Sequence, residues 1–386
     1  MKLLLVGGTG VLSSAVARHA LRSGFRVTMI NRGKRPIPDG AELLVCDCHR
    51  HAAIESMLSG RQFDAVIDFL CYTTEDVKAS FTLYSRHCSQ YIYISSCAVY
   101  DTRKAGVMTE ESAKGLPIWN YSIDKWNSEV LLAELAATSS CRTTVIRPSV
   151  TYGDTRIPYG IMPPYGYHWT LPARILNGKP IVRWNGGENR CNMMRVEDFA
   201  VGCIGLVGNP YAYGEAFNIC GDETPSFNDV LLVLSELLGK KVITFDLESD
   251  FFAKEFPSKS GEILGGRSLD SLNSNAKIKR IVPAFKQTIG LRDGIARTLD
   301  AYTANNYQQG IDWKFDAEMD RIIRKWCNIR KIKSTPYKLA FYDYLGTASL
   351  CDRKTYYETA YRESTFFKAV SKIRHVLRDG VKLPTH

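Results

Sequence analysis

A short apolar segment at the start of the chain runs directly into a glycine-rich turn, and this feature limits the fold more than any other. Residues 3–6 are apolar, and helical periodicity follows over residues 15–23. Glycines between them let the backbone turn tightly around a pyrophosphate, whose charge the free N–H groups of a helix N-terminus can meet. Ser13 occupies the usual third glycine position and is small enough for close helix–sheet packing. The turn predicts a dinucleotide site formed by Gly7, Thr9, Gly10, Val11 and Leu12.

The first 150 residues continue as short β-rich runs separated by helical stretches. Further strands are expected at residues 26–30, 42–46, 65–70, 91–95 and 143–147. Fully apolar strands alternating with helices indicate a parallel sheet covered on both faces. We therefore expect an α/β fold with a Rossmann-like, doubly wound parallel sheet, in which residues 1–150 bind the cofactor.

The end of the second predicted strand indicates which dinucleotide is bound. An acidic residue usually stands there in NAD-binding sheets, where it contacts the ribose 2′-hydroxyl. This chain instead has Asn31 and Arg32, followed by Lys34 and Arg35. Guanidinium and ammonium groups suit a 2′-phosphate, so we expect NADP to be favoured over NAD. The alternative is a basic loop that contacts only solvent.

Residues beyond 150 differ from the first 150 residues in their residue pattern and in their charge. Prolines, glycines and tyrosines follow residue 151, before helical patterns at residues 171–177, 196–206 and 227–238. We expect residues 151–304 to form a smaller substrate-binding lobe that is interleaved with the sheet. Residues 305–386 hold sixteen basic and nine acidic side chains, so this segment carries +7 of the net charge of +10. The segment is predicted to be a basic, helical extension rich in aromatic residues, which are Tyr337, Phe341, Tyr342, Tyr344, Tyr356, Tyr357, Phe366 and Phe367.

Cysteine usage and hydropathy indicate the compartment. The apolar run at the start is too short for a signal peptide or a membrane span, and the eleven cysteines lie mostly in apolar segments. We expect a cytoplasmic protein with reduced thiols and no membrane span. The cluster from Cys46 to His51 contains several zinc-ligand types but lacks a second ligand pair at a usual spacing, so no metal site is predicted.

Three side chains suggest acid/base chemistry. Tyr121 and Lys125 are four residues apart, which places both on one face of a helix. A nearby ammonium favours the phenolate and lets a tyrosine exchange protons near neutral pH. Upstream, the strand at residues 91–95 ends in the hydroxyls of Ser95 and Ser96, at the edge where parallel sheets bind ligands.

Together these motifs resemble the extended short-chain dehydrogenase/reductase family, which holds nucleotide-sugar epimerases, dehydratases and ketoreductases. The resemblance covers about residues 1–300 and includes the runs at residues 64–68, 95–100, 147–153, 196–198 and 217–219. It implies Ser96, Tyr121 and Lys125 as the catalytic residues, with Lys125 also holding the nicotinamide ribose. It places further cofactor contacts at Asp47, Cys48, Leu70, Pro148 and Val150.

Departures from the family pattern disfavour one of the family's reactions and leave the diphosphate-binding arginine open. Cys97 and Ala98 stand where sugar-nucleotide dehydratases carry an Asp-Glu pair, so dehydration is disfavoured. The arginine motif expected to bind the substrate diphosphate is altered, which leaves Arg174, Arg190 and Arg195 as candidates, beside Ser96 and Tyr121 at the sugar.

The leading hypothesis is an NAD(P)-dependent epimerase or ketoreductase that acts on a nucleotide-activated sugar. The alternatives are a reductase of another carbonyl compound and a cofactor-regulated RNA-binding protein of the same fold. A complete Ser/Tyr/Lys set favours an enzyme, so nucleic acid is not the expected partner. The resemblance also implies a homodimer.

Overall fold

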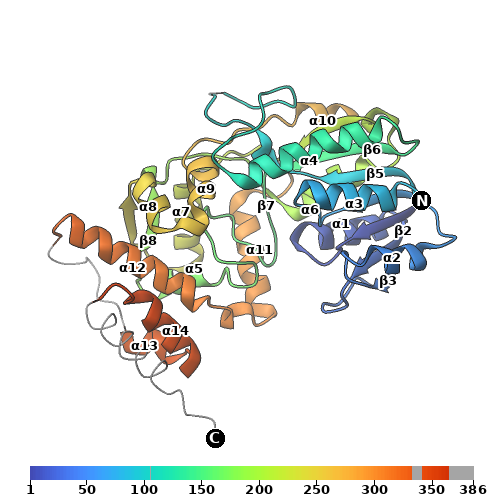
Figure 1. The fold of residues 1–386 in the computed structure, drawn as a ribbon. Coiled ribbons are helices and arrows are strands. Elements are labelled where there is room, and N and C mark those ends of the chain that lie inside the picture. Colours follow the sequence, from blue (N-terminus) through green and yellow to red (C-terminus); the bar gives the residue numbers. More distant parts are fainter. Residues whose placement is uncertain (105, 333–340, 365–386) are drawn as a thin grey trace, which may run out of the picture.

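A seven-stranded parallel sheet forms one side of the molecule in the computed structural model, which describes residues 1–104, 106–332 and 341–364 (Figure 1). The strand order is β10-β6-β5-β4-β1-β2-β3, and every neighbouring pair is parallel. The predicted Rossmann-like fold is therefore confirmed. The strands are β1 (Lys2–Val6), β2 (Arg26–Asn31), β3 (Glu42–Val45), β4 (Phe63–Asp68), β5 (Cys88–Ile94), β6 (Arg142–Pro148) and β10 (Glu215–Ile219).

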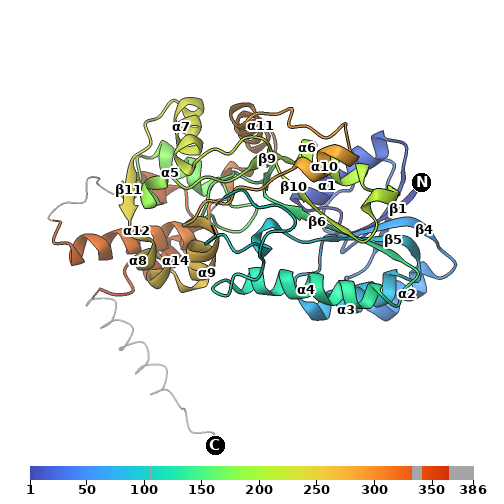
Figure 2. The same cartoon turned by 90° about the horizontal axis from the view of Figure 1, so that it is seen from above.

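Helices cover both faces of this sheet. Helices α1 (Val11–Arg22), α6 (Val196–Gly205) and α10 (Ala276–Ile281) lie on one face, and α2 (His51–Leu58), α3 (Thr74–Tyr84) and α4 (Asn120–Ala136) lie on the other (Figure 2). Alternate residues of β1 supply the two cores, with Leu3 and Leu5 on the α1 side and Leu4 and Val6 on the α2 side. This two-sided burial explains why the strands are apolar throughout rather than alternating.

A second lobe is built from two small sheets and several helices. Strand β7 (Val150–Tyr152) pairs with β9 (Met193–Arg195), and β8 (Ile181–Trp184) pairs with β11 (Thr244–Leu247). Because β10 joins the large sheet after β7, β8 and β9, the chain passes through the lobe before it completes the sheet. The lobe helices are α5 (Thr170–Leu176), α7 (Phe227–Leu238), α8 (Ser249–Glu255), α9 (Ser260–Glu262) and α11 (Leu291–Ala304).

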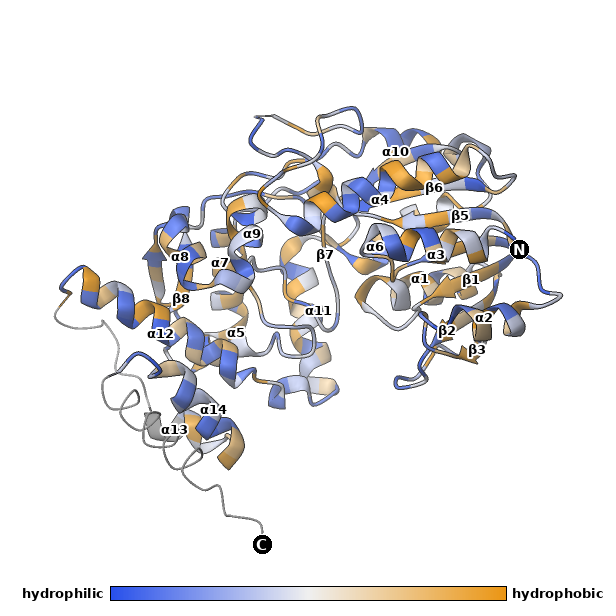
Figure 3. Cartoon of the chain, viewed as in Figure 1, coloured by the Kyte–Doolittle hydropathy of each residue, from blue (hydrophilic) through white to orange (hydrophobic). Residues whose placement is uncertain are grey.

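The described part of the extension is helical, as the sequence predicts. It consists of α12 (Trp313–Ile329), α13 (Phe341–Gly346) and α14 (Leu350–Ala360), which lie beside α5 on the side away from the large sheet (Figure 1). Figure 3 shows polar and apolar residues mixed along α12, and its apolar residues Met319, Ile322 and Ile323 belong to the core of the lobe. The aromatic residues Tyr337, Phe366 and Phe367 lie outside the described residues.

The cysteine side chains are free thiols, and all except Cys351 are buried or half-buried. Within the described ranges, none of the helices combines the length and apolarity needed to cross a bilayer.

Candidate active site

The glycine turn lies at the carboxyl edge of the sheet, between β1 and α1. Gly7 and Gly8 have φ values of 111° and 63°, which L-residues with side chains rarely adopt. A Cβ on Gly8 would overlap the side chain of Met29, so the turn passes too close to β2 for any larger residue. Ser13 is buried, and its hydroxyl accepts a hydrogen bond of 2.9 Å from the Gly10 N–H. A serine therefore fits the position where the third glycine was expected.

This edge of the sheet fits a dinucleotide. Helix α1 begins after Gly10 without a side-chain cap, so its first N–H groups are available to a pyrophosphate. At the end of β2, the buried Nδ2 of Asn31 has no hydrogen-bond partner among the described residues, although its Oδ1 accepts from the Gly33 N–H. A buried amide donor without a partner is rare and is expected where a ligand supplies the acceptor.

The basic residues after β2 divide into two groups. Arg32 and Lys34 are exposed beyond the strand end, whereas Arg35 donates a hydrogen bond of 3.1 Å to the carbonyl of Thr9 in the glycine turn. Arg35 therefore stabilises the turn, and Arg32 and Lys34 remain available for a 2′-phosphate.

The other predicted cofactor residues lie on neighbouring strand ends. The side chain of Leu70, which follows β4, lies within 3.2 Å of the position that a Cβ on Gly7 would take. Asp47 follows β3, and its carboxylate accepts from the His49 N–H, which is the main cause of its lowered pKa. Cys48 is half-buried, and burial raises its pKa. Pro148 ends β6, and Val150 begins β7.

Ser96 and Tyr121 meet beyond the end of β5. Ser96 begins the short 3₁₀ turn at Cys97–Val99, where its hydroxyl accepts from the Ala98 N–H at 3.1 Å. Tyr121 lies in the first turn of α4 and is half-buried. Burial raises the pKa of Tyr121 to about 12, and both the Ser96 hydroxyl and the charge of Arg156 oppose this rise. The two hydroxyls could therefore hold one substrate oxygen.

Lys125 lies one turn further along α4 and is buried. Its Nζ donates to the carbonyl oxygens of Cys71 at 2.6 Å and Ile94 at 3.0 Å. The rings of Tyr72 and Tyr93 lie 5.0 and 4.8 Å away. Burial lowers the pKa of this ammonium to about 8, so it carries a proton at neutral pH.

A buried ion pair anchors α4 beneath these groups. Glu129 accepts from the hydroxyl of Ser95 at 2.5 Å and forms a 2.5 Å ion pair with Arg147 of β6. Arg147 also donates to the hydroxyl of Tyr100 at 2.8 Å. Because Ser95 precedes Ser96, a single carboxylate connects the strand end that carries Ser96 to the helix that carries Tyr121.

The three arginines expected to bind the substrate are held by other partners. Arg174 is buried and paired with Asp316 and Asp320 of α12, so it faces the extension rather than Tyr121. Arg195 is buried against Asp154 and Glu197 and also donates to Gly294 and Thr298. Arg190 is exposed and is bound to Thr224. These contacts correct the expectation for Arg174 and Arg195, whose charges are already neutralised, and they leave Arg190 as a surface residue.

Two arginines that the sequence reasoning missed lie near the Cys191 thiol, and one of them also influences Tyr121. Arg156 follows β7, donates to the carbonyl of Thr151 at 2.9 Å and lies 5.2 Å from the ring of Tyr165. It forms no ion pair within the part of the chain that the structure describes, and its charge lowers the pKa of Tyr121. Arg267 has a buried Nε without a partner among the described residues. Both arginines act on the Cys191 thiol, opposing the pKa rise that burial causes. The sequence signal was weak, because Arg156 stands just beyond the run at residues 147–153.

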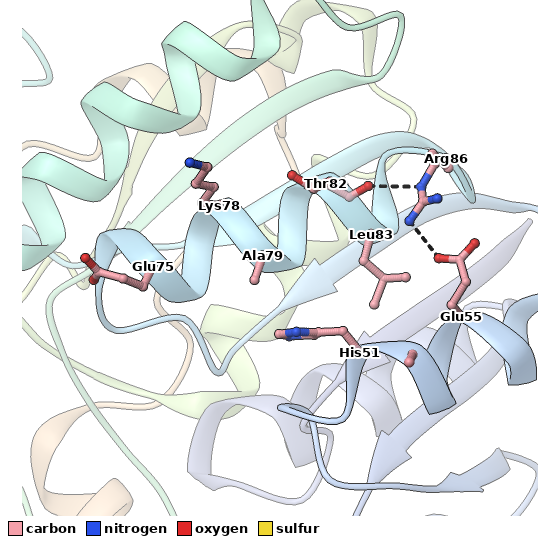
Figure 4. A pocket seen from close by; sticks show the side chains of 9 residues that line it. His51, Glu55, Glu75, Lys78, Ala79, Thr82, Leu83 and Arg86 are labelled. Atoms are coloured by element: carbon pink, nitrogen blue, oxygen red, sulfur yellow. Dashed lines mark hydrogen bonds and ion pairs between the residues drawn. The ribbon is translucent and has the colours of Figure 1, made fainter.

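Two other features involve residues on or next to α2. A groove of about 550 Å³ runs between α2 and α3, where Glu55 pairs with Arg86 at 2.8 Å (Figure 4). The ligand-type atoms of Asp47, Cys48 and His49 come within 4.8 Å of one another. Neither feature includes the hydroxyls of Ser96 and Tyr121.

The glycine turn between β1 and α1, at the edge of a parallel sheet, is typical of the dinucleotide-binding class of proteins. Residues 3–220 match the model of the NAD dependent epimerase/dehydratase family. The chain belongs to this family.

Two relatives are similar in sequence. The chloroplast stem-loop binding protein of 41 kDa b from Arabidopsis thaliana is 27% identical over 242 residues, 59% of this chain and 60% of that protein. The uncharacterised UDP-glucose epimerase YtcB of Bacillus subtilis (strain 168) is 22% identical over 218 residues, 56% of this chain and 61% of that protein. The chain thus matches about three fifths of the length of each of these two curated relatives.

Solved structures share the fold. A UDP-glucose 4-epimerase from Thermotoga maritima, solved with UDP-glucose, has a TM-score of 0.64 at 17% identity and covers 79% of this chain and 100% of its own. A UDP-glucuronic acid 4-epimerase from Bacillus cereus, solved with NAD, has a TM-score of 0.63 at 17% identity, with coverages of 80% and 100%.

Proposed function

We propose that the chain is an NAD(P)-dependent epimerase or ketoreductase that acts on a nucleotide-activated sugar through Ser96, Tyr121 and Lys125. The observation that carries this proposal is the placement of Tyr121 and the buried Lys125 ammonium one turn apart on α4, with Ser96 just beyond the end of β5. Family membership and the named UDP-sugar epimerases support it.

The residues of the chain would act at one carbinol group. A nicotinamide bound at the glycine turn would accept hydride from the sugar carbon or donate hydride to it. Tyr121 Oη takes the proton from the sugar hydroxyl as that carbon is oxidised and returns it on reduction. Ser96 Oγ holds the same oxygen, and Lys125 stays protonated near the ribose. Arg156 provides positive charge beside the phenol, which favours its ionised form.

Replacement of Tyr121 by phenylalanine tests this assignment. Tyr121→Phe should lower turnover of UDP-glucose or UDP-glucuronic acid by about 10²- to 10⁴-fold, because the proton acceptor is lost. Binding of NAD and UDP should persist. Tyr211→Phe, at a tyrosine that is 77% exposed, provides the control. Full turnover in Tyr121→Phe would contradict the proposed role.

The nucleotide that copurifies with the protein distinguishes epimerase from reductase. An epimerase returns hydride to the same carbon, so it should release tightly held NAD(P) only on denaturation. A reductase should bind NADPH reversibly and consume it in proportion to product. The latter outcome, with a carbonyl compound that carries no nucleotide, would favour the alternative reductase.

We also propose that NADP is preferred, on the basis of the exposed Arg32 and Lys34 and the absence of a carboxylate at the end of β2. Replacing both residues by alanine should weaken NADP binding about tenfold or more, because charge-assisted hydrogen bonds to the 2′-phosphate are lost. The NAD affinity should change little. Arg26→Ala, at the opposite end of β2, is the control. Calorimetric titration showing equal NADP and NAD affinities in the wild-type protein would refute the preference.

The organisation of the molecule is proposed on the same basis. Residues 1–150 with returning segments hold the cofactor, residues 151–304 hold the sugar nucleotide, and residues 305–386 form a separate extension. We further propose a cytoplasmic homodimer that uses α4, for which sedimentation of the full chain gives the mass.

RNA binding is a second candidate, favoured by the similarity to the stem-loop binding protein. The described part of the extension supports RNA binding only weakly, since Arg321, Lys325 and Arg362 are paired with glutamates. Titration with a stem-loop RNA at 50 and 200 mM salt distinguishes the candidates. Tight, strongly salt-dependent binding without sugar turnover would favour the RNA function.

A further inference from the structure

The C-terminal extension is similar in length to the part of this chain that the solved epimerases leave uncovered. Those structures are matched over their full length but cover only 79 to 80% of this chain. The uncovered part of this chain is about as long as residues 305–386. A segment added to a complete fold needs its own physical role, and its contacts indicate that role.

The start of the extension lies directly against a loop of the lobe, at residues 163–169. A Cβ on Gly310 would overlap the carbonyl oxygen of Gly166, so the two backbones touch. The Asp312 N–H donates to Thr170 Oγ1 at 2.9 Å, and that hydroxyl donates to the Tyr167 carbonyl at 2.7 Å. The extension therefore contacts the loop at its middle and at its end.

The other side of the same loop contacts Arg156 and Ile157, which follow β7. The ring of Tyr165 lies 5.2 Å from the Arg156 guanidinium and 5.6 Å from the ring of His168. The charge of Arg156 also opposes the rise in the Tyr121 pKa that burial causes. His168 accepts from the Ile157 N–H at 3.0 Å, and burial lowers its pKa to about 3, so it stays neutral. The loop thus adjoins the electrostatic surroundings of Tyr121.

The extension is firmly anchored on its far side. Asp316 and Asp320 of α12 pair with Arg174 and Lys179 of the lobe, and all four side chains are buried. The hydroxyl of Tyr356 in α14 donates to Asp320 at 2.5 Å. Displacing α12 would leave buried charges unpaired, which is strongly unfavourable. The extension can therefore act as a fixed support.

We propose that the extension is a positioning element of the substrate site. It holds the 163–169 loop in place, and the loop in turn keeps Tyr165 against Arg156 beside Tyr121. This inference rests on the proposed function for its substrate, a nucleotide-activated sugar. Thr170 and Gly310 are the positioning residues, since they act through the loop.

Alanine at Gly310 tests the contact directly. Gly310 has φ −80°, so alanine suits the backbone, but its Cβ would push against Gly166. Gly310→Ala should raise KM for the nucleotide sugar about 10- to 100-fold, because a small displacement near the reacting groups disturbs their alignment. The pKa of Tyr121 read from the pH profile should also shift, and the NAD affinity should not. Gly346→Ala in the same extension meets no atom within 4 Å and should behave like the wild type.

Thr170 provides an independent variant for the case in which Gly310→Ala disrupts folding. Thr170→Val removes the hydroxyl that connects Asp312 to Tyr167 and should raise KM, whereas Thr170→Ser retains the hydroxyl and should restore it. An unchanged KM and pH profile in folded Gly310→Ala and Thr170→Val would overturn the proposal.

A measurement without substrate separates this proposal from the proposed function. Amide hydrogen exchange of residues 163–170 should accelerate in Gly310→Ala and Thr170→Val, but not in Gly346→Ala. If the wild type turns over no nucleotide sugar, the proposed function fails, whereas faster exchange still supports the loop contact. Unchanged exchange in both variants would overturn the positioning role by itself.

Discussion

The Lys125 ammonium is buried in a site that replaces water with two backbone carbonyls and the faces of two tyrosines. These partners do not fully compensate the loss of hydration, and burial lowers the pKa to about 8. The group is therefore poised close to physiological pH. A cofactor ribose bound beside it would accept one of its protons in a hydrogen bond and would favour the charged form.

The pH dependence of stability should reveal this buried lysine. Between about pH 8 and 10.5, Lys125 is protonated in the unfolded chain and neutral in the folded protein, so its contribution makes the free energy of unfolding rise with pH. Relative to Lys125→Met, the wild type should gain about 2 to 3 kcal/mol between pH 7 and 10. Urea unfolding at several pH values measures the difference, in which the buried tyrosines cancel. The exposed Lys78→Met variant is the control, and a flat difference for Lys125→Met would contradict the burial effect.

At the scale of the secondary-structure element, α4 holds three of these side chains in one rigid segment. Tyr121, Lys125 and Glu129 recur every four residues and share one face of the helix. The first two residues form the site, and the third fixes the helix to β5 and β6 through Ser95 and Arg147. The spacing of Tyr121 and Lys125 was recognisable from the sequence, but the role of Glu129 depends on partners 34 and 18 residues away.

Glutamine at position 129 should therefore weaken both stability and turnover. Glu129→Gln removes one charge of a buried pair and leaves Arg147 poorly compensated, which should destabilise the protein by about 3 kcal/mol. Turnover should fall more than cofactor affinity, because Ser96 and Tyr121 lose their common anchor. Glu134→Gln, on an exposed face of α4, is the control. A melting temperature and kcat equal to those of the wild type would exclude the anchoring role.

At the scale of the whole molecule, the large sheet was predictable because short local sequence patterns indicate its strands and turns. Each strand is an apolar run bounded by turn residues, and the glycines before α1 suit only a tight turn. The predicted and observed ends of the strands differ by a few residues, because pairing with a neighbouring strand decides where a strand ends. Strand β4 begins at Phe63, opposite Cys88, whereas the apolar pattern suggested residue 65. Ser96 and Tyr121 were singled out because one follows a strand end, the other stands four residues before Lys125, and the family resemblance covers both; their catalytic role stays a prediction.

The arginines were less predictable because their partners lie far away in the sequence. Arg174 is paired with Asp316 and Asp320, more than 140 residues later. Arg156 follows β7 and is 35 residues from Tyr121 in the sequence, so its influence on that hydroxyl depends on the tertiary fold. A guanidinium suits a buried ion pair and a phosphate equally well, so its type alone does not assign its role.

The late entry of β10 into the large sheet has an evolutionary consequence. The lobe is built from two chain segments, one between β6 and β10 and one after β10, so relatives could exchange it only through several coordinated crossovers. The extension follows α11 and could be gained in a single fusion event. However, α12 now supplies Met319, Ile322 and Ile323 to the core of the lobe, so its later loss would expose apolar surface. Acquisition was thus the easier direction, and the extension and the lobe would since have diverged together.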